Sequence, residues 1–206
     1  NPRIKGESVL KTDFTKDAAR EKLLKNQAKN FKVKRLKEIC DKLVEKYHNY
    51  SEQEMYQHIQ SIAKHAVNAG NVNLEVYGRE NIPQEGGFML YSNHQGMFDI
   101  VALVSDIDTP ISFVYKKELH NKPVLGDISK CMKGFPLDRS DARQGLTVIR
   151  NVTDEVKKGR NYIIYPEGTR SKQSNNMGEF HHGSFRPAVT AKCPILPICM
   201  IDSFKV

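Results

Sequence analysis

The chain has 206 residues, of which 39% are hydrophobic, enough for one ordinary domain or for one domain with a small appendage. Its 32 lysines and arginines against 24 acids give a net charge of +8, which favours anionic partners such as phosphorylated metabolites, acidic lipid or nucleic acid. The composition excludes a disordered chain, and the longest apolar run, 194–201, is far shorter than the roughly 20 residues of a membrane-spanning helix.

Residues 1–70 are predicted to form a basic helical segment ahead of the main domain. Between 17 and 47, ten lysines and arginines stand against five acids. Apolar residues recur in that span mostly three or four positions apart, at Leu24, Ala28, Phe31, Leu36, Ile39, Leu43 and Tyr47. This spacing predicts an amphipathic helix with a strongly basic polar face. Asn1 is not a natural start residue, so we expect the natural N-terminus to lie upstream.

A second helix is predicted to follow directly. Ser51 and Glu54 form the Ser-x-x-Glu capping box that begins a helix, which is expected to run to about Ala69 with Gly70 as its C-cap. The two helices either pack on the domain with a solvated charged face or lie on an anionic membrane, where each basic residue near the surface contributes about 1 kcal/mol. The sequence is compatible with both roles.

From residue 71 onward, short apolar runs alternate with turns and periodic segments. Strands are predicted at 73–77, 88–91, 111–115, 161–165 and 196–202. Pro197 is expected to interrupt the start of the last strand. Helices are predicted at 99–105 and 148–158. The pattern predicts an α/β domain over 71–206, with a mixed, largely parallel sheet flanked by helices and an N-terminal helical appendage.

The four cysteines give no sign of a disulfide framework. They have no Cys-x-x-Cys spacing and no secretory signal precedes them: Cys40, Cys131, Cys193 and Cys199. A reduced, cytoplasmic setting with buried thiols is therefore expected.

The first candidate motif, His94-Gln-Gly-Met-Phe-Asp99, follows the strand predicted at 88–91. Five positions on an ideal helix rotate a side chain by about 140°, so His94 and Asp99 can meet only across a turn that leads into a helix. Gly96 permits such a turn. Asp99 would then accept the Nδ1 proton of His94 and leave Nε2 to deprotonate a substrate hydroxyl. Taken alone, a capping aspartate near a structural histidine explains the same residues.

The second candidate motif is Tyr165-Pro-Glu-Gly-Thr-Arg170, at the end of another predicted strand. Gly168 allows a ligand to approach the backbone, Thr169 offers a hydroxyl donor and Arg170 a planar fork for a phosphate. Glu167 can hold a glycerol hydroxyl or the arginine. An ordinary proline-initiated turn with a surface arginine accounts for an isolated match. Together, the two motifs predict a site that deprotonates a hydroxyl on a phosphorylated substrate.

These motifs resemble those of the glycerolipid acyltransferases, which esterify glycerol 3-phosphate or lysophosphatidate, and especially the bacterial 1-acyl-glycerol-3-phosphate acyltransferases. The family's first signature, His followed by four residues and Asp and commonly preceded by Asn, matches 93–99. Gly134-Phe-Pro-Leu-Asp138-Arg139 corresponds to the second signature, with Leu137 where Ile or Val is usual. The third, Glu-Gly-Thr-Arg, is unchanged at 167–170, and 193–197 fits the fourth, with Cys193 in place of a small or apolar residue.

The resemblance implies a role for each site residue. The catalytic residues would be His94, Asp99 and, for the oxyanion, Lys116, together with a backbone N–H near Gly168. The substrate-binding residues would be Asn93, Arg139, Glu167, Gly168, Thr169 and Arg170, with Pro194 and Pro197 on the acyl side. Lys117 is an adjacent rival of Lys116, because only one of the two can face the site from an extended segment. No metal is expected at His181 and His182, since adjacent histidines on a loop rarely complete a site.

The implied reaction is direct acyl transfer to 1-acyl-glycerol 3-phosphate, giving phosphatidic acid for phospholipid synthesis. The expected partners are lysophosphatidate, an acyl-CoA or acyl-carrier protein as cosubstrate, and an anionic membrane surface. No cofactor is expected, and no nucleic acid, because the basic helices lack interleaved aromatic residues. The expected location is peripheral, on the cytoplasmic side of the cell membrane. The family domain normally continues beyond the position of Val206, so 71–206 is expected to lack its C-terminal part.

Three alternatives stay open. The acceptor could be glycerol 3-phosphate or another lysophospholipid. A phosphate-monoester hydrolase would use the same histidine and carboxylates, but it needs a metal or a covalent nucleophile that the sequence does not clearly contain. A non-catalytic basic lipid-binding adaptor would bind without acyl transfer and would keep its binding when His94 is removed.

Overall fold

The computed structural model describes residues 10–13, 33–46 and 49–206. These residues form a seven-stranded sheet in the order β2-β1-β7-β3-β6-β4-β5. The strands are β1 (Leu10–Asp13), β2 (Glu75–Tyr77), β3 (Met89–Ser92), β4 (Ile111–Lys116), β5 (Phe135–Leu137), β6 (Asn161–Ile164) and β7 (Ile195–Met200). β2 pairs with β1 in the antiparallel sense and every other pairing is parallel. The predicted mixed, largely parallel sheet is confirmed.

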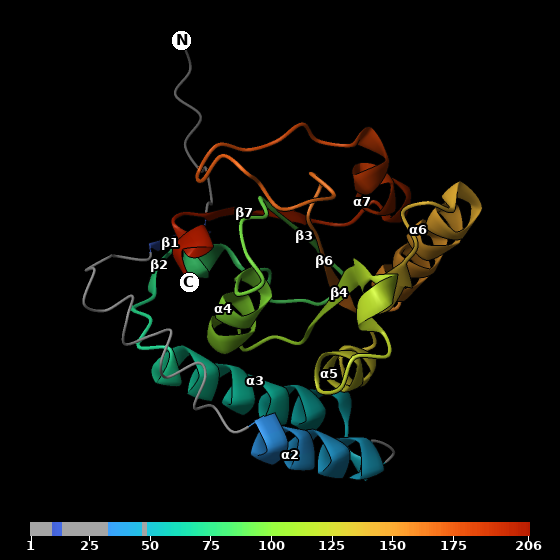
Figure 1. The fold of residues 1–206 in the computed structure, drawn as a ribbon. Coiled ribbons are helices and arrows are strands. Elements are labelled where there is room, and N and C mark those ends of the chain that lie inside the picture. The colour runs from blue at the N-terminus through green and yellow to red at the C-terminus, as the bar shows by residue number, and fades with distance from the viewer. Residues whose placement is uncertain (1–9, 14–32, 47–48) are drawn as a thin grey trace.

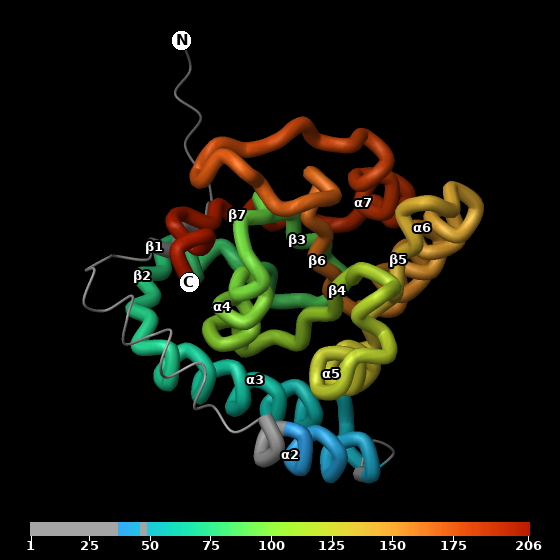
Figure 2. Tube along the Cα trace, viewed as in Figure 1, coloured from blue at the N-terminus to red at the C-terminus, as the bar shows by residue number. Residues whose placement is uncertain are grey.

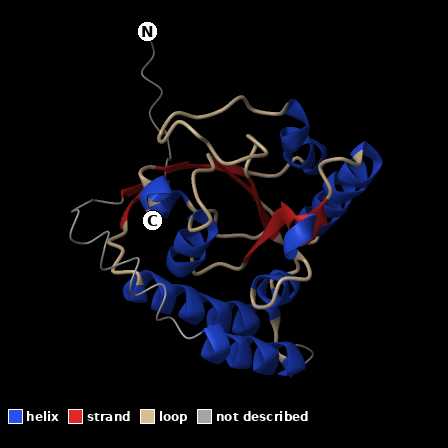
Figure 3. Cartoon of the chain, in the orientation of Figure 1, coloured by secondary structure: helices blue, strands red, loops and turns tan. Residues whose placement is uncertain are grey.

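Helices cover the sheet in two layers (Figures 1 and 3). They are α2 (Val33–Lys46), α3 (Glu52–Ala69), α4 (Asp99–Asp106), α5 (Leu125–Cys131), α6 (Ala142–Lys157) and α7 (Arg186–Ala191). Alternation along β3 sends Phe88 and Leu90 into the core shared with α3 and α4, whereas Met89 and Tyr91 enter a second core with α6 and α7. Both faces of β3 are therefore buried, as in the centre of a parallel α/β sheet.

The parallel strands all end at one edge of the sheet, and the candidate motifs lie in the segments that follow them. The segment after β3 carries His94, the segment after β6 carries Glu167 to Arg170, and β5 is followed by Arg139. Ligand sites of parallel α/β sheets lie outside the carboxyl ends of the strands. The loop between β6 and α7, orange in Figure 2, arches over the sheet in this view.

The elements predicted beyond residue 71 are all present, with shifted ends. The helix predicted at 148–158 begins earlier, at Ala142, because the Asp141 side chain caps it by accepting the N–H groups of Arg143 and Gln144. Pro197 was expected to break the start of the last strand, but it lies inside β7, opposite Tyr91. The carbonyl of Pro194, just before β7, accepts the Met89 N–H and therefore points toward β3. The backbone groups of successive residues point to opposite sides of a strand, so the nitrogen of Pro197 points away from β3. The hydrogen bonds between β3 and β7 therefore lose no donor at this proline.

The N-terminal region differs in part from the predicted pair of helices. β1 lies within the predicted helical segment, yet it pairs with both β7 and β2. Its sequence, Leu-Lys-Thr-Asp, has no apolar alternation, so the strand depends on long-range pairing that a local pattern does not reveal. Most of the first predicted helix, 17–32, lies outside the described residues, and its observed part ends at Lys46, close to the predicted end.

The second predicted helix is confirmed as α3, and its capping box is formed. The Ser51 hydroxyl accepts the Glu54 N–H at 3.2 Å, and the Glu54 carboxylate accepts the Ser51 N–H at 2.8 Å. Gly70 caps the C-terminus in a right-handed conformation, and the positive φ falls on the next residue, Asn71.

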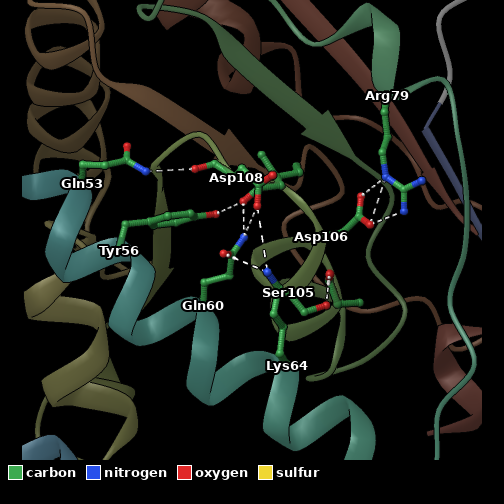
Figure 4. Close-up of polar contacts among 10 residues, drawn as sticks. Gln53, Tyr56, Gln60, Lys64, Arg79, Ser105, Asp106 and Asp108 are labelled. Atoms are coloured by element: carbon green, nitrogen blue, oxygen red, sulfur yellow. Dashed lines mark hydrogen bonds and ion pairs between the residues drawn. The ribbon is translucent and has the colours of Figure 1, made fainter.

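α3 docks on the C-terminal end of α4 through polar side chains (Figure 4). The Tyr56 hydroxyl and the Gln60 amide both donate to the Ile107 carbonyl, at 2.9 and 3.0 Å, and Gln60 also reaches the Asp108 carboxylate. These bonds satisfy a helix-end carbonyl that would otherwise be buried without a donor. The N-terminal residue of α4 is Asp99, so the same docking also supports the first candidate motif.

α2 also packs on the domain. Cys40 and Leu43 are buried, with Leu43 in the same core as α3 and α4. Burial raises the pKa of the Cys40 thiol to about 11, which keeps it protonated. The packing role that the sequence left open is therefore present in the described part of these helices.

Within the described ranges, no helix is both long enough and apolar enough to cross a bilayer.

Replacing Ser51 by Ala is expected to lower the free energy of unfolding by about 0.5–2 kcal/mol, because it removes the cap of α3. Chemical denaturation measures this value. The matched control is Ser61→Ala, the same change at an exposed position inside α3, which should be neutral or slightly stabilising because alanine is the better helix former. Equal effects of the two substitutions would contradict the capping role.

Candidate active site

His94 and Asp99 meet as predicted, across the turn between β3 and α4. His94 Nδ1 lies 2.7 Å from Asp99 Oδ2, and the Asp99 side chain is fully buried whereas that of His94 is 20% exposed. The carboxylate also accepts the N–H groups of Gln95 at 2.7 Å and Gly96 at 3.1 Å. The turn therefore wraps its own backbone donors around the aspartate, and the aspartate holds one ring nitrogen of the histidine.

Gly96 serves this turn through its small size. Its φ is not in the left-handed region, so backbone freedom is not what the position requires. A Cβ there would come 3.1 Å from the carbonyl oxygen of Ser203. The glycine thus lets the turn pack closely against the segment that follows β7.

The two candidate motifs are joined through the backbone of His94. Its N–H donates to Glu167 Oε1 at 2.8 Å, and its carbonyl accepts the Ser171 N–H at 2.7 Å. The other oxygen of Glu167 accepts the Gly178 N–H at 2.8 Å, and this side chain is only 3% exposed. Glu167 was expected to hold a glycerol hydroxyl or an arginine; in the structure it connects His94 to the loop after β6.

Asn93, expected among the substrate-binding residues, forms structural hydrogen bonds with its side chain. Its side chain is buried, and its amide forms a two-way pair with the backbone of Met200, accepting at 2.7 Å and donating at 2.9 Å. The pair continues the β3–β7 contact beyond the last residue of β3. Next to it, the Gln95 amide donates to the Met200 carbonyl and to Asn175. Sequence reasoning missed Gln95, although an amide directly after a buried strand is a residue type suited to such pairing.

Gly168 has a left-handed backbone, with φ of 64°, which explains the glycine in the second motif. Its N–H donates to the Tyr165 carbonyl at 3.0 Å and closes the expected proline-initiated turn. The N–H of Gly168 itself is thus already bonded within the turn. The Thr169 and Arg170 side chains are exposed, and Arg170 has no ion-pair partner among the described residues.

Lys116 and Lys117 lie at the end of β4, which β6 separates from β3. Lys116 Nζ is exposed and pairs with Glu118 at 2.9 Å. Lys117 Nζ lies 3.1 Å from Asp138, whose carboxylate also accepts the N–H and hydroxyl of Ser140. These bonds, chiefly those from Ser140, lower the pKa of Asp138 to about 2.

Arg139 follows Asp138 and is exposed. The carboxylate of Asp138, its neighbour in the chain, is bonded to Lys117 and Ser140 and does not pair with Arg139. Arg139 has no ion pair within the described part of the chain. Arg139 and Arg170 therefore both carry a solvent-accessible guanidinium in segments that follow parallel strands, where a phosphate could be bound.

The two prolines of the fourth signature lie away from His94. Pro194 precedes β7, and its carbonyl accepts the N–H of Met89 at the start of β3. It is therefore at the opposite edge of the sheet, separated from the end of β7 by six residues, or roughly 20 Å of strand. Pro194 was expected on the acyl side of the site, and the structure places it at this far edge; Pro197 lies midway along the same strand.

Tyr165 is a site residue that the sequence interpretation quoted but assigned no role. Its ring is stacked on the His94 imidazole, with centroids 4.1 Å apart and planes inclined by 23°. Alternation along β6 and the residue after it is the signal that the sequence offers, because Ile163 and Tyr165, two positions apart, enter the same core. Leu90 of β3 belongs to that core as well. The pairing of β3 with β6, which brings the two rings together, is not visible in the sequence.

His181 and His182 are exposed in the loop before α7. Among the residues that the structure describes, no group of three or more His, Cys, Asp or Glu side chains is placed to hold a metal ion. The groups available at this edge are a histidine held by a buried carboxylate and exposed arginines in the segments after β5 and β6. Such a set can deprotonate a hydroxyl on an anionic substrate.

Comparison with known proteins identifies relatives of this arrangement. The chain is 33% identical over 133 residues to the chloroplastic 1-acyl-sn-glycerol-3-phosphate acyltransferase BAT2 of Brassica napus, covering 64% of this chain and 38% of that protein. It is 38% identical over 128 residues to the 1-acyl-sn-glycerol-3-phosphate acyltransferase of Pseudomonas aeruginosa, covering 62% and 49% of the two chains. The chain therefore spans half or less of these two relatives.

A solved structure supports the fold. The crystal structure of the 1-acyl-sn-glycerophosphate acyltransferase of Thermotoga maritima matches with a TM-score of 0.71 and 22% identity, covering 87% of this chain and 73% of that one. At this identity the likeness establishes the fold alone. The sequence model named Acyltransferase matches residues 73–201, more than half of the chain and nearly all of the sheet described above. The chain belongs to the Acyltransferase family.

Proposed function

We propose that this chain carries out O-acyl transfer from an acyl thioester to the free hydroxyl of 1-acyl-glycerol 3-phosphate, giving phosphatidic acid. The observation that carries the proposal is His94, with Nδ1 bonded to buried Asp99 and its backbone held by the Glu-Gly-Thr-Arg segment. The names of the relatives support the same reaction class and acceptor. They do not distinguish acyl-CoA from acyl-carrier protein as the donor.

In the proposed mechanism, Nε2 of His94 takes the proton of the acceptor hydroxyl while Asp99 supports the resulting imidazolium. The oxygen attacks the thioester carbonyl carbon and a tetrahedral oxyanion forms. When the carbon–sulfur bond breaks, the imidazolium returns its proton to the departing thiolate. General-base help of this kind contributes about 10²–10⁴-fold in rate. The scheme needs no metal and no organic cofactor.

Lys116 remains our candidate for holding the oxyanion. Its ion pair with Glu118 is exposed, and such pairs contribute about 0–1 kcal/mol, so the ammonium can leave Glu118 at little cost. Lys117 stays the rival candidate, since its bond to Asp138 is an exposed pair of the same kind. Arg139 and Arg170, with the hydroxyl of Thr169, are proposed to bind the phosphate of the acceptor.

The acceptor and product are lipids, so we propose peripheral binding to an anionic membrane on its cytoplasmic side. The basic residues of the N-terminal segment support this through charge attraction. On this proposal Leu24, Phe31, Leu36 and Leu43 would enter the interface. Leu43 is buried in the protein core, which removes it from this set. Leu24 and Phe31 lie outside the described residues.

His94→Ala and Asp99→Asn are each expected to lower acyl transfer by about 100-fold or more, because the first removes the base and the second the group that orients it. The assay offers labelled acyl-CoA and acyl-carrier protein with lysophosphatidate and glycerol 3-phosphate in parallel. His65→Ala, at an exposed position on α3, is the control and should match the wild type. Near-normal turnover by folded His94→Ala protein would end the proposed mechanism.

Arg139→Ala and Arg170→Ala should each raise the KM for the phosphorylated acceptor by about 10- to 150-fold, since each removes a charge-assisted hydrogen bond of roughly 1.5–3 kcal/mol. Arg150→Ala, an exposed arginine on α6, is the matched control. If the KM of the acyl donor rose instead while that of the acceptor stayed constant, the assignment of these arginines to phosphate would be wrong.

Charge reversal at Lys25, Lys29 and Lys32, which lie outside the described residues, should weaken binding to anionic vesicles and spare activity on a short-chain soluble acceptor. Reversal at the exposed residues Lys122, Lys157 and Lys192 changes the net charge equally and is the control. Sedimentation with vesicles across a salt series measures the binding. Equal, salt-independent binding to neutral and anionic vesicles would leave the N-terminal segment with a packing role only.

A further inference from the structure

We propose that the ring of Tyr165 positions the His94 imidazole and stabilises its protonated form during the reaction, and that the tyrosine hydroxyl takes no part. The role of His94 as general base belongs to the proposed function, on which this inference rests. The stacking itself is a property of the structure and can be tested separately.

The imidazole of His94 is held at one ring nitrogen, at its backbone and on one ring face. Asp99 holds Nδ1 in the plane of the ring, and Glu167 and Ser171 hold the backbone on either side. Tyr165 covers one face, with centroids 4.1 Å apart and planes 23° from parallel. Rotation of the imidazole would break both the bond to Asp99 and the stack. The ring of Tyr165 thus helps to keep Nε2 pointed in one direction.

The hydroxyl of Tyr165, unlike its ring, does not bind any group of the site. It is buried and is without a hydrogen-bond partner among the described residues. Burial, with a further contribution from the charge of Asp99, raises the pKa of Tyr165 well above 10, so the group stays protonated and neutral. A buried hydroxyl without a partner destabilises the fold. The contact that Tyr165 makes with the site is therefore made by its aromatic face.

An aromatic face attracts a cation, because the ring quadrupole is negative above and below its plane. The imidazole gains a positive charge when it takes the substrate proton, so the stack becomes more favourable as the reaction proceeds. Among the described residues, the charged groups hydrogen-bonded to His94 are Asp99, at Nδ1, and Glu167, at its backbone N–H. Asp99 binds in the plane of the imidazole and Glu167 binds the backbone, whereas Tyr165 contacts a face of the ring.

Tyr165→Leu is expected to lower kcat by about 3- to 30-fold, with the acceptor KM changed by no more than about twofold. Tyr165→Phe keeps the ring and should retain at least half of the wild-type kcat. It should also raise the Tm by about 2–8 °C, because the unpartnered hydroxyl is gone. Tyr165→Met, with a flexible side chain that fills the space, should behave as Tyr165→Leu does and provides a second test if the leucine variant does not fold.

The control is Tyr115→Leu. Tyr115 is another buried tyrosine stacked on a histidine, His120, with ring centroids 6.2 Å apart, and it makes no contact with His94. It should lower stability without a specific loss of kcat. A kcat loss that appears equally in the control, or in Tyr165→Phe, would overturn the role assigned to the ring. So would an unchanged kcat in both Tyr165→Leu and Tyr165→Met.

A spectroscopic measurement separates this inference from the proposed function. The stacked ring should shift the His94 imidazole proton resonances upfield in the wild type and in Tyr165→Phe, and the shift should be lost in Tyr165→Leu. If the wild type transferred no acyl group from any thioester, the proposed function would fail while this signal still reported the stack. Resonances that do not respond to loss of the ring would refute the stacking itself.

Discussion

The site depends on two hydrogen bonds to the backbone of one residue. The N–H of His94 donates to Glu167, and its carbonyl accepts the N–H of Ser171. Both partners follow β6, so the turn after β3 and the turn after β6 form one rigid unit. Because Asp99 then holds the side chain at Nδ1, the position of Nε2 is determined by main-chain and buried carboxylate contacts. This is the kind of pre-organised support that a general base requires.

The two buried carboxylates of the site, Asp99 and Glu167, have different structural roles. Asp99 collects backbone donors from its own turn and orients the imidazole, whereas Glu167 connects the histidine to Gly178 in the long loop before α7. Each is buried and hydrogen-bonded, which is the condition under which a buried charge is tolerated. The same loop is linked to the first turn by the Gln95–Asn175 hydrogen bond. The loop thus forms part of the wall of the site.

The exposed side chains at this edge have a different character. Arg139 and Arg170 have no ion-pair partners in the described part of the chain, while Lys117 is bonded to Asp138. Exposed guanidinium groups in segments that follow parallel strands suit an anionic ligand, since planar donors can bind a phosphate in two places. The packing of α3 on α4 also contributes from a distance, because it holds the helix whose first residue is Asp99.

The sequence by itself determined the α/β class, the ends of α3 and the meeting of His94 with Asp99, because capping, strand alternation and a short turn are local properties. It did not reveal β1, the bracing roles of Asn93 and Glu167, the position of Pro194 at the far edge or the stacking of Tyr165. These depend on the strand order, in which β3 lies between β7 and β6. The order is set by long-range packing of buried faces, so only the tertiary structure could show which residues hold the site together.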